Sequence, residues 1–155
     1  MITNFRIIAF VIAMLFISDR NIFAQIHADD VLGVWYVEGK EPAKVEIFKQ
    51  AGKYSGKIIW LKNPVTPSGK PKNDKNNPDH KLRDRDVVGI QILTDLQFDG
   101  KSEWINGIIY DPESGNTYKC YMWLEGKDKL KVRGFLGLSV LGRTEEWKRI
   151  STIKN

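Results

Sequence analysis

The chain has 155 residues, of which 42% are apolar and 11% aromatic, and it carries a formal net charge of +5. This length fits one domain and is too short for two ordinary ones, and the composition excludes collagen-like, coiled-coil and low-complexity chains. A basic balance can indicate a nucleic-acid partner, but the lysines are scattered rather than clustered, so we expect a solvated basic surface and no nucleic acid partner.

The first 24 residues are typical of a cleavable export signal. Arg6 supplies a positive charge, and residues 7–17 are an unbroken apolar run. A membrane-spanning helix needs about 20 apolar residues, so this shorter run fits a signal-peptide core, with an uncleaved anchor as the alternative. Cleavage after Ala24 would release residues 25–155 as a single domain without stable membrane insertion. No cysteine that could carry a lipid lies near the cut, so we expect a periplasmic or secreted protein.

Short segments with alternating apolar residues follow, separated by turn signals, and they predict strands rather than helices. A short turn capped by Asp29 precedes the first strand, and a long polar loop, residues 62–86, separates the third strand from the fourth. The expected strands cover residues 33–37, 43–49, 54–61, 87–98, 103–110, 117–125 and 130–135, and residues 139–141 and 144–150 complete the chain.

Tight turns between consecutive strands favour antiparallel, up-and-down order. Closing such a sheet removes its exposed edges, and about eight strands make a barrel that holds side chains or one small ligand. The sequence therefore predicts an all-β fold, a small antiparallel up-and-down β-barrel, with a β-sandwich as the alternative. The single cysteine, Cys120, lies in an apolar strand pattern, which indicates a buried thiol and not a disulfide.

Three groups of residues, taken in order, resemble one bacterial family. They are DDVLGVW at residues 29–35, GKIIWLKNP at residues 56–64 with GKPKNDKNNPD and LRDRDVVGIQIL after it, and IYDPESGNTYKCYMWL at residues 109–124 followed by KVRGFLGLSVLGRTEEWKR. Together these motifs are similar to the exported family known as the domain of unknown function DUF2147, over about residues 29–150.

This resemblance implies a small, envelope-located protein with a lipocalin-like or calycin-like fold and no established activity. Many members of the family carry two cysteines near the second and third strands, whereas Gln50 and Ser55 stand near those places in this chain. A disulfide at that position in relatives is therefore absent here.

The lipocalin likeness also implies a way of closing the barrel. Lipocalins begin with a G-x-W motif, which Gly33 and Trp35 match, and an arginine of the last strand covers that tryptophan. Arg143 or Arg149 would have this structural role, since a guanidinium plane stacks on an indole ring.

Residues 73–86, NDKNNPDHKLRDRD, are the most polar stretch of the chain. They lack the glycine and the closing glutamate of an EF-hand loop, and His27 and His80 are too far apart in sequence to indicate a zinc site. We therefore expect no metal and no cofactor. No G-x-S-x-G nucleophile motif occurs and no pair of carboxylates stands out, so we expect a binding protein rather than an enzyme, with unrecognised carboxylate chemistry left open.

The same stretch has the Asn-Pro and Asx chemistry that orders turns, and we expect an ordered lid or rim over one mouth of the barrel. Arg83 and Arg85 alternate, so in an extended segment both side chains point the same way and could grip a carboxylate or phosphate. The alternative is that they pair with Asp84, Asp86 or carbonyl groups of the loop.

Aromatic side chains fall within the expected strands. We take Trp60, Tyr110, Tyr118 and Trp123 as candidates for lining a ligand cavity, with core packing as the alternative for each. Tyr118 and Trp123 lie on opposite faces of their strand, so its outer face could also meet a neighbouring surface or a second protomer.

These observations favour a carrier that binds a small apolar or amphiphilic ligand in the cell envelope, with an anionic end of the ligand near Arg83 and Arg85. The second hypothesis is a filled barrel that docks to another envelope protein through its outer face. We expect the chain to be a monomer or a homodimer.

Overall fold

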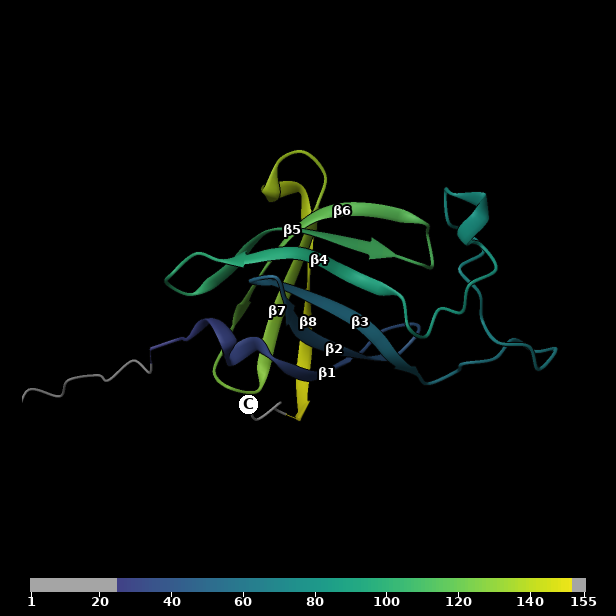
Figure 1. The fold of residues 1–155 in the computed structure, drawn as a ribbon, viewed down its shortest axis with the longest axis horizontal. Coiled ribbons are helices and arrows are strands. Elements are labelled where there is room, and N and C mark those ends of the chain that lie inside the picture. The colour runs from purple at the N-terminus through teal and green to yellow at the C-terminus, as the bar shows by residue number, and fades with distance from the viewer. Residues whose placement is uncertain (1–24, 152–155) are drawn as a thin grey trace, which may run out of the picture.

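The structure is a computed structural model that describes residues 25–151, so the expected export signal lies outside the described residues. Eight antiparallel strands form a closed barrel in which neighbours follow one another in sequence order (Figure 1). The strands are β1 (Gly33–Val37), β2 (Ala43–Gln50), β3 (Lys53–Leu61), β4 (Gln91–Phe98), β5 (Glu103–Asp111), β6 (Asn116–Leu124), β7 (Lys129–Phe135) and β8 (Gly142–Ser151), and the 3₁₀ turns are η1 (Ala28–Val31), η2 (His80–Leu82) and η3 (Ser139–Leu141).

The barrel closes because β1 pairs with strands on both of its sides. It pairs with β2 from Gly33 to Val37, and with β8 through partners such as Tyr36 and Lys148. The last strand therefore covers the edge of the first, which leaves the sheet without a free edge. This topology confirms the predicted up-and-down barrel and excludes the sandwich.

Two local expectations are wrong, the start of the fourth strand and the cap of the first turn. The strand expected from residue 87 begins only at Gln91, because the preceding residues turn at Gly89, whose φ is 101°. Residues 139–141 form the 3₁₀ turn η3, which leads into β8. Asp29 is not the cap of the first turn. The turn η1 begins at Ala28 with His27 as its N-cap, and the carboxylate of Asp30 accepts a hydrogen bond from the His27 N–H. None of the helices within residues 25–151 is long and apolar enough to cross a membrane.

The two ends of the barrel differ in the size of their inward-facing side chains. At the end that carries η1 and the β2–β3, β4–β5 and β6–β7 turns, which we call the closed end, large side chains are fully buried. These are Val31, Trp35, Tyr54, Leu96, Trp104, Met122 and Leu130. The indole N–H groups of Trp35 and Trp104 donate to the carbonyls of Val31 and Ala28, at 2.9 and 3.0 Å. The closed end is therefore filled by aromatic rings whose polar atoms are satisfied.

An arginine of the last strand covers the closed end. The guanidinium of Arg149 lies 4.1 Å from the centroid of the Trp35 ring. It also donates to the carbonyls of Asp30, Leu32 and Lys127, at 2.5, 2.9 and 2.6 Å. One side chain thus joins η1, the β6–β7 turn and β8.

Of the two arginines expected over Trp35, Arg149 has this position and Arg143 does not. Arg143 is near the other end of β8, where 85% of its side chain is exposed. The difference follows from strand direction, because the two residues are six positions apart on one extended strand and so lie at opposite ends of the barrel.

Replacing Arg149 should therefore destabilise the barrel. We expect Arg149→Ala to lower the free energy of unfolding by about 2 kcal/mol, because three carbonyl groups lose a charged donor and the indole loses its cover. Arg149→Lys should recover only part of this loss, since an ammonium lacks the planar fork. Urea denaturation measures the effect. The matched control, Arg143→Ala, should stay within about 0.5 kcal/mol of the wild type, and equal losses in both variants would contradict the closure role.

Candidate functional site

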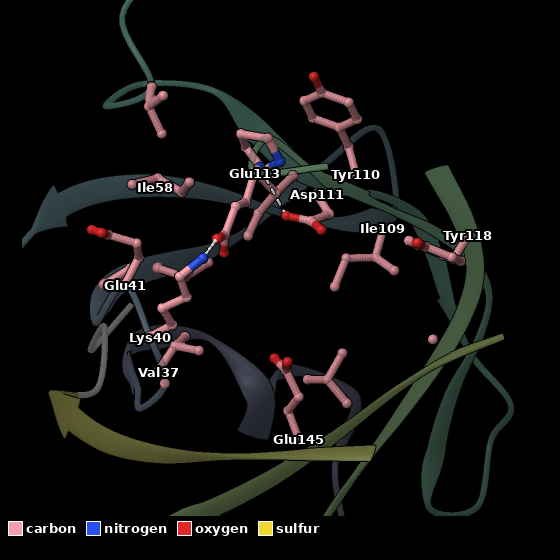
Figure 2. A pocket seen from close by; sticks show the side chains of 18 of the residues that line it. Val37, Lys40, Glu41, Ile58, Ile109, Tyr110, Asp111, Glu113, Tyr118 and Glu145 are labelled. Atoms are coloured by element: carbon pink, nitrogen blue, oxygen red, sulfur yellow. Dashed lines mark hydrogen bonds and ion pairs between the residues drawn. The ribbon is translucent and has the colours of Figure 1, made fainter. Parts of the chain in front are cut away.

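A cavity of about 900 Å³ occupies the other end of the barrel, which we call the open end. It lies where the β1–β2, β3–β4, β5–β6 and β7–β8 connections meet, and residues of all four connections contribute to its rim. Figure 2 shows side chains from the β1–β2 and β5–β6 connections, and from the strands below them, around a common space. Binding pockets for small molecules have volumes of roughly 300–1,000 Å³, so this volume is sufficient for a ligand.

The wall of the cavity is apolar. Apart from Trp147, it consists of aliphatic residues and glycine, whereas the aromatic residues Trp35, Tyr54 and Trp104 fill the closed end. The wall is formed by Val37, Ala43, Val45, Ile58, Leu61, Ile92, Ile109, Val132, Gly134 and Trp147. Alanine, valine and glycine leave space that tryptophan and methionine fill on the other side. The cavity therefore results from a change in side-chain size along the barrel axis.

Ion pairs join separate connections at the rim. Lys40, between β1 and β2, is paired with Glu113, between β5 and β6 (Figure 2). Lys72 of the long β3–β4 loop is paired with Glu41 at 2.8 Å. Both pairs are partly exposed, so each contributes little to stability. They surround the mouth with polar groups while the wall below stays apolar.

The long loop between β3 and β4 is ordered around one buried carboxylate. Asp74 has no exposed surface. It accepts hydrogen bonds from the Asn77 amide at 2.7 Å, from the Tyr110 hydroxyl at 2.5 Å, and from Arg85 at 2.8 and 3.0 Å. A buried charge is tolerated only when it is paired and hydrogen-bonded in this way. Asp74, in the first half of the loop, therefore binds Arg85 in its second half and Tyr110 of β5, which fixes both halves of the loop to the barrel.

A glycine lets the same loop rest on the β5–β6 turn. Gly115 has a φ of 76°, and a Cβ at this position would lie 1.9 Å from the carbonyl oxygen of Asn76. The Asn76 amide also donates to the carbonyl of Glu113 at 2.5 Å. Only glycine allows the two backbones to approach so closely. The loop therefore lies directly against the β5–β6 turn and forms part of the rim. Figure 1 shows the segment extending beyond the ends of the strands, and its residues Thr66, Pro67, Lys72, Asn73, Lys75, Asn76 and Val87 line the cavity.

Arg83 and Arg85 both have partners inside the loop. Arg85 pairs with Asp74, and the Nε of Arg83 donates to the carbonyl of Asn77 at 2.7 Å. The alternative of pairing within the loop is therefore confirmed for Arg83, which uses a loop carbonyl, whereas Arg85 uses Asp74 rather than Asp84 or Asp86. Neither arginine lines the cavity described above, and anion binding by them stays a prediction that this arrangement does not favour.

The four aromatic candidates divide between the inside and the outside of the barrel. Tyr118 and Tyr110 line the cavity (Figure 2). Trp60 is 38% exposed, with the ammonium of Lys44 over its ring, and Trp123 stacks on Tyr121. Both lie outside the cavity. On β6, Trp123 alternates with the inward Tyr118 and Met122. On β3, a bulge at Ile59 turns Trp60 outward although it follows the inward Ile58 by two residues.

Two features of the site were missed at the level of sequence. The first is Glu145, whose carboxylate points into the cavity from β8. Strand alternation with Trp147 was the signal that could have found it. The second is the central role of Asp74, which no local pattern distinguishes from the other acidic residues of the loop. Cys120 is buried and free, as expected, and burial raises its pKa to about 12.

The pKa of Tyr110 is raised to about 12, first by burial and then by its hydrogen bond to Asp74. The folded protein thus holds the phenol protonated beyond its ordinary pKa of 10. Because folding favours the protonated phenol, Tyr110 contributes to the free energy of unfolding. By linkage, this contribution is fully present below about pH 10 and is lost as the pH rises toward 12. It is constant across the physiological range.

The loop network predicts that Tyr110→Phe loosens the rim. Asp74 would lose a donor while remaining buried, which should reduce the free energy of unfolding by about 1–3 kcal/mol. Amide hydrogen exchange should become faster in residues 72–87, where Asp74 and Val87 donate across the two arms. The matched control is Tyr118→Phe, a tyrosine of the cavity, which should leave exchange in the loop unchanged. Unchanged exchange in Tyr110→Phe would show that the hydroxyl does not hold the loop.

Comparisons with known proteins agree with this architecture. A search of solved structures finds similarity to a chain described as "Protein HP1028 from the human pathogen Helicobacter pylori belongs to the lipocalin family", with a TM-score of 0.67 and 28% identity, covering 77% of this chain and 82% of that chain. No curated protein matches. A family model described as "Uncharacterized protein conserved in bacteria (DUF2147)" matches residues 33–149. That match spans the barrel from β1 to β8, and the chain therefore belongs to the DUF2147 family, with a lipocalin-like fold.

Proposed function

We propose that this protein is a carrier that binds one small apolar or amphiphilic molecule in the bacterial cell envelope. The observation that carries the proposal is the cavity of about 900 Å³, which has an apolar wall and a polar rim. An apolar ligand gains free energy when it leaves water for such a wall, at about 25 cal/mol for each Å² buried. The expected export signal supports a periplasmic or secreted location.

The open end supports a carrier more than a filled barrel. A filled barrel would need large side chains throughout, whereas Ala43, Val45 and Gly134 leave their end empty. The likeness to a lipocalin-family chain also supports ligand binding in the barrel. The proposal needs no cofactor.

A second function, docking to another envelope protein, is favoured by one specific observation. The connection between β7 and β8 exposes four aliphatic side chains, Leu136, Leu138, Val140 and Leu141, at 64–75%. Arg133 holds this connection in place by donating to the carbonyls of Ser139 and Val140. Exposed apolar groups held in one shape are typical of interaction sites.

The expectation that the chain is not an enzyme stays a prediction. A buried carboxylate without a partner would favour catalysis. Asp74 is buried, but it has three side-chain partners. Within the described residues, every buried side-chain nitrogen or oxygen has a hydrogen-bond partner.

Native mass spectrometry of the mature protein, purified from its own envelope without detergent, tests the carrier function. An adduct that is reproducible and is lost on denaturation is the expected result, and extraction would identify it. A clean apo mass together with no binding of added apolar probes would overturn the proposal. A mass of two chains would instead support a homodimer and direct attention to the outer face.

Two adjacent isoleucines allow a sharper test. Ile109 faces the cavity and Ile108, which is 40% exposed, faces outward. We expect Ile109→Trp to fill part of the cavity and to weaken binding of the uncharged probe N-phenyl-1-naphthylamine at least about tenfold, a loss of about 1.4 kcal/mol. Ile108→Trp should bind the probe as the wild type does. Fluorescence titration measures both, and equal binding by the two variants would place the probe outside the barrel.

A further inference from the structure

One carboxylate, that of Glu145, lies in the otherwise apolar wall of the cavity. A charged group in this place indicates which class of ligand the cavity would bind. Resting on the proposed carrier function, we infer that Glu145 is the polar anchor of the cavity and that the preferred ligand is an amphiphile with a protonated amine at its polar end.

Glu145 lies inside the barrel, below the mouth. It follows Arg143 and precedes Trp147 on the inward face of β8, and its cross-strand partner on β7 is the buried Val132. Figure 2 shows its carboxylate directed into the open space. The side chain is still 38% exposed, so it is accessible from the cavity.

The other carboxylates that the described residues bring to the cavity are already engaged. Glu113 pairs with Lys40, Glu41 pairs with Lys72, and Glu38 pairs with Lys148. Asp111 accepts hydrogen bonds within its own turn, from the Glu113 N–H and the Ser114 hydroxyl. Each of these four carboxylates therefore already has a close cationic or hydrogen-bonding partner within the protein.

Glu145 has only weak partners. The indole N–H of Trp147 donates to it at 3.3 Å, beyond the usual range for such a bond. The Nε of Arg143 is 3.8 Å away on a side chain that is 85% exposed, so solvent screens this pair. Most of the hydrogen-bonding capacity of the carboxylate is therefore available to a ligand.

The basic groups of the cavity lie at its rim. Lys40, Lys72 and Lys75 belong to connections between strands, and Arg143 is the second residue of β8. A ligand whose polar end reaches Glu145 passes these groups and meets a carboxylate in an apolar wall. There an ammonium gains a charge-assisted hydrogen bond, a hydroxyl gains a neutral one, and a carboxylate is repelled, which is more costly in an apolar wall than in water.

The test compares three amphiphiles that differ only in the polar end: decylamine, decanol and decanoate. Each displaces N-phenyl-1-naphthylamine from the mature protein at neutral pH, and fluorescence reports the displacement. We expect decylamine to bind about tenfold more tightly than decanol, and decanoate to bind most weakly. This order in the wild type tests the inference without any variant.

Glu145→Gln removes the charge and keeps the size of the side chain. Decylamine should then lose about tenfold in affinity, while decanol changes by less than about twofold. The matched control is Glu146→Gln, because Glu146 faces outward from the next position of β8 and pairs with Lys131. It should leave the order and the affinities unchanged.

The outcomes separate this inference from the carrier function on which it rests. If the probe binds but decylamine and decanol bind equally, the amine preference is wrong and the carrier function stands. If Glu145→Gln weakens all three amphiphiles equally, Glu145 shapes the cavity rather than selecting the charge, and the inference is overturned. If neither the probe nor any amphiphile binds, both proposals fail.

Discussion

The change in side-chain size along the barrel axis is the constraint on which the rest of the structure depends. Eight strands enclose an interior that side chains can fill. Trp35 and Trp104 fill it at one end, whereas Ala43 and Gly134 leave it open at the other. Because interiors pack closely, this asymmetry produces one solid end that stabilises the barrel and one hollow end, on which the proposed carrier function depends. The two roles are separated along a single axis.

Much of the fold could be predicted from the sequence, because alternation and turn signals are local. The strand around Leu130 and Val132 alternates with lysine and arginine, and the structure buries both aliphatic residues. The closure was implied by the lipocalin likeness, in which an arginine of the last strand covers a tryptophan of the first, and Arg149 and Trp35 make this contact. The boundary at residues 87–90 failed because a turn at Gly89 interrupts an apolar run.

The site was less predictable, because its parts come together only through tertiary contacts. Tyr110 and Tyr118 were identified as cavity residues from their strands, but Trp60 and Trp123 were not separated from them, since an aromatic type alone does not tell the inner face from the outer. The partner of Arg85 is Asp74, across the loop rather than beside it in sequence. The importance of Glu145 could not be predicted, because it depends on the apolar residues of other strands that surround it in the cavity.

The attachment of the long loop has a consequence for how fast a ligand can exchange. Asp74 and Gly115 join the loop to β5 and to the β5–β6 turn, so the rim and the barrel wall behave as one body. In this arrangement the cavity is open at its rim, so the proposed ligand could enter while the loop keeps its place. Association would follow a single kinetic phase that scales with ligand concentration, and residence time would be set by the contacts that the ligand makes with the wall and with Glu145.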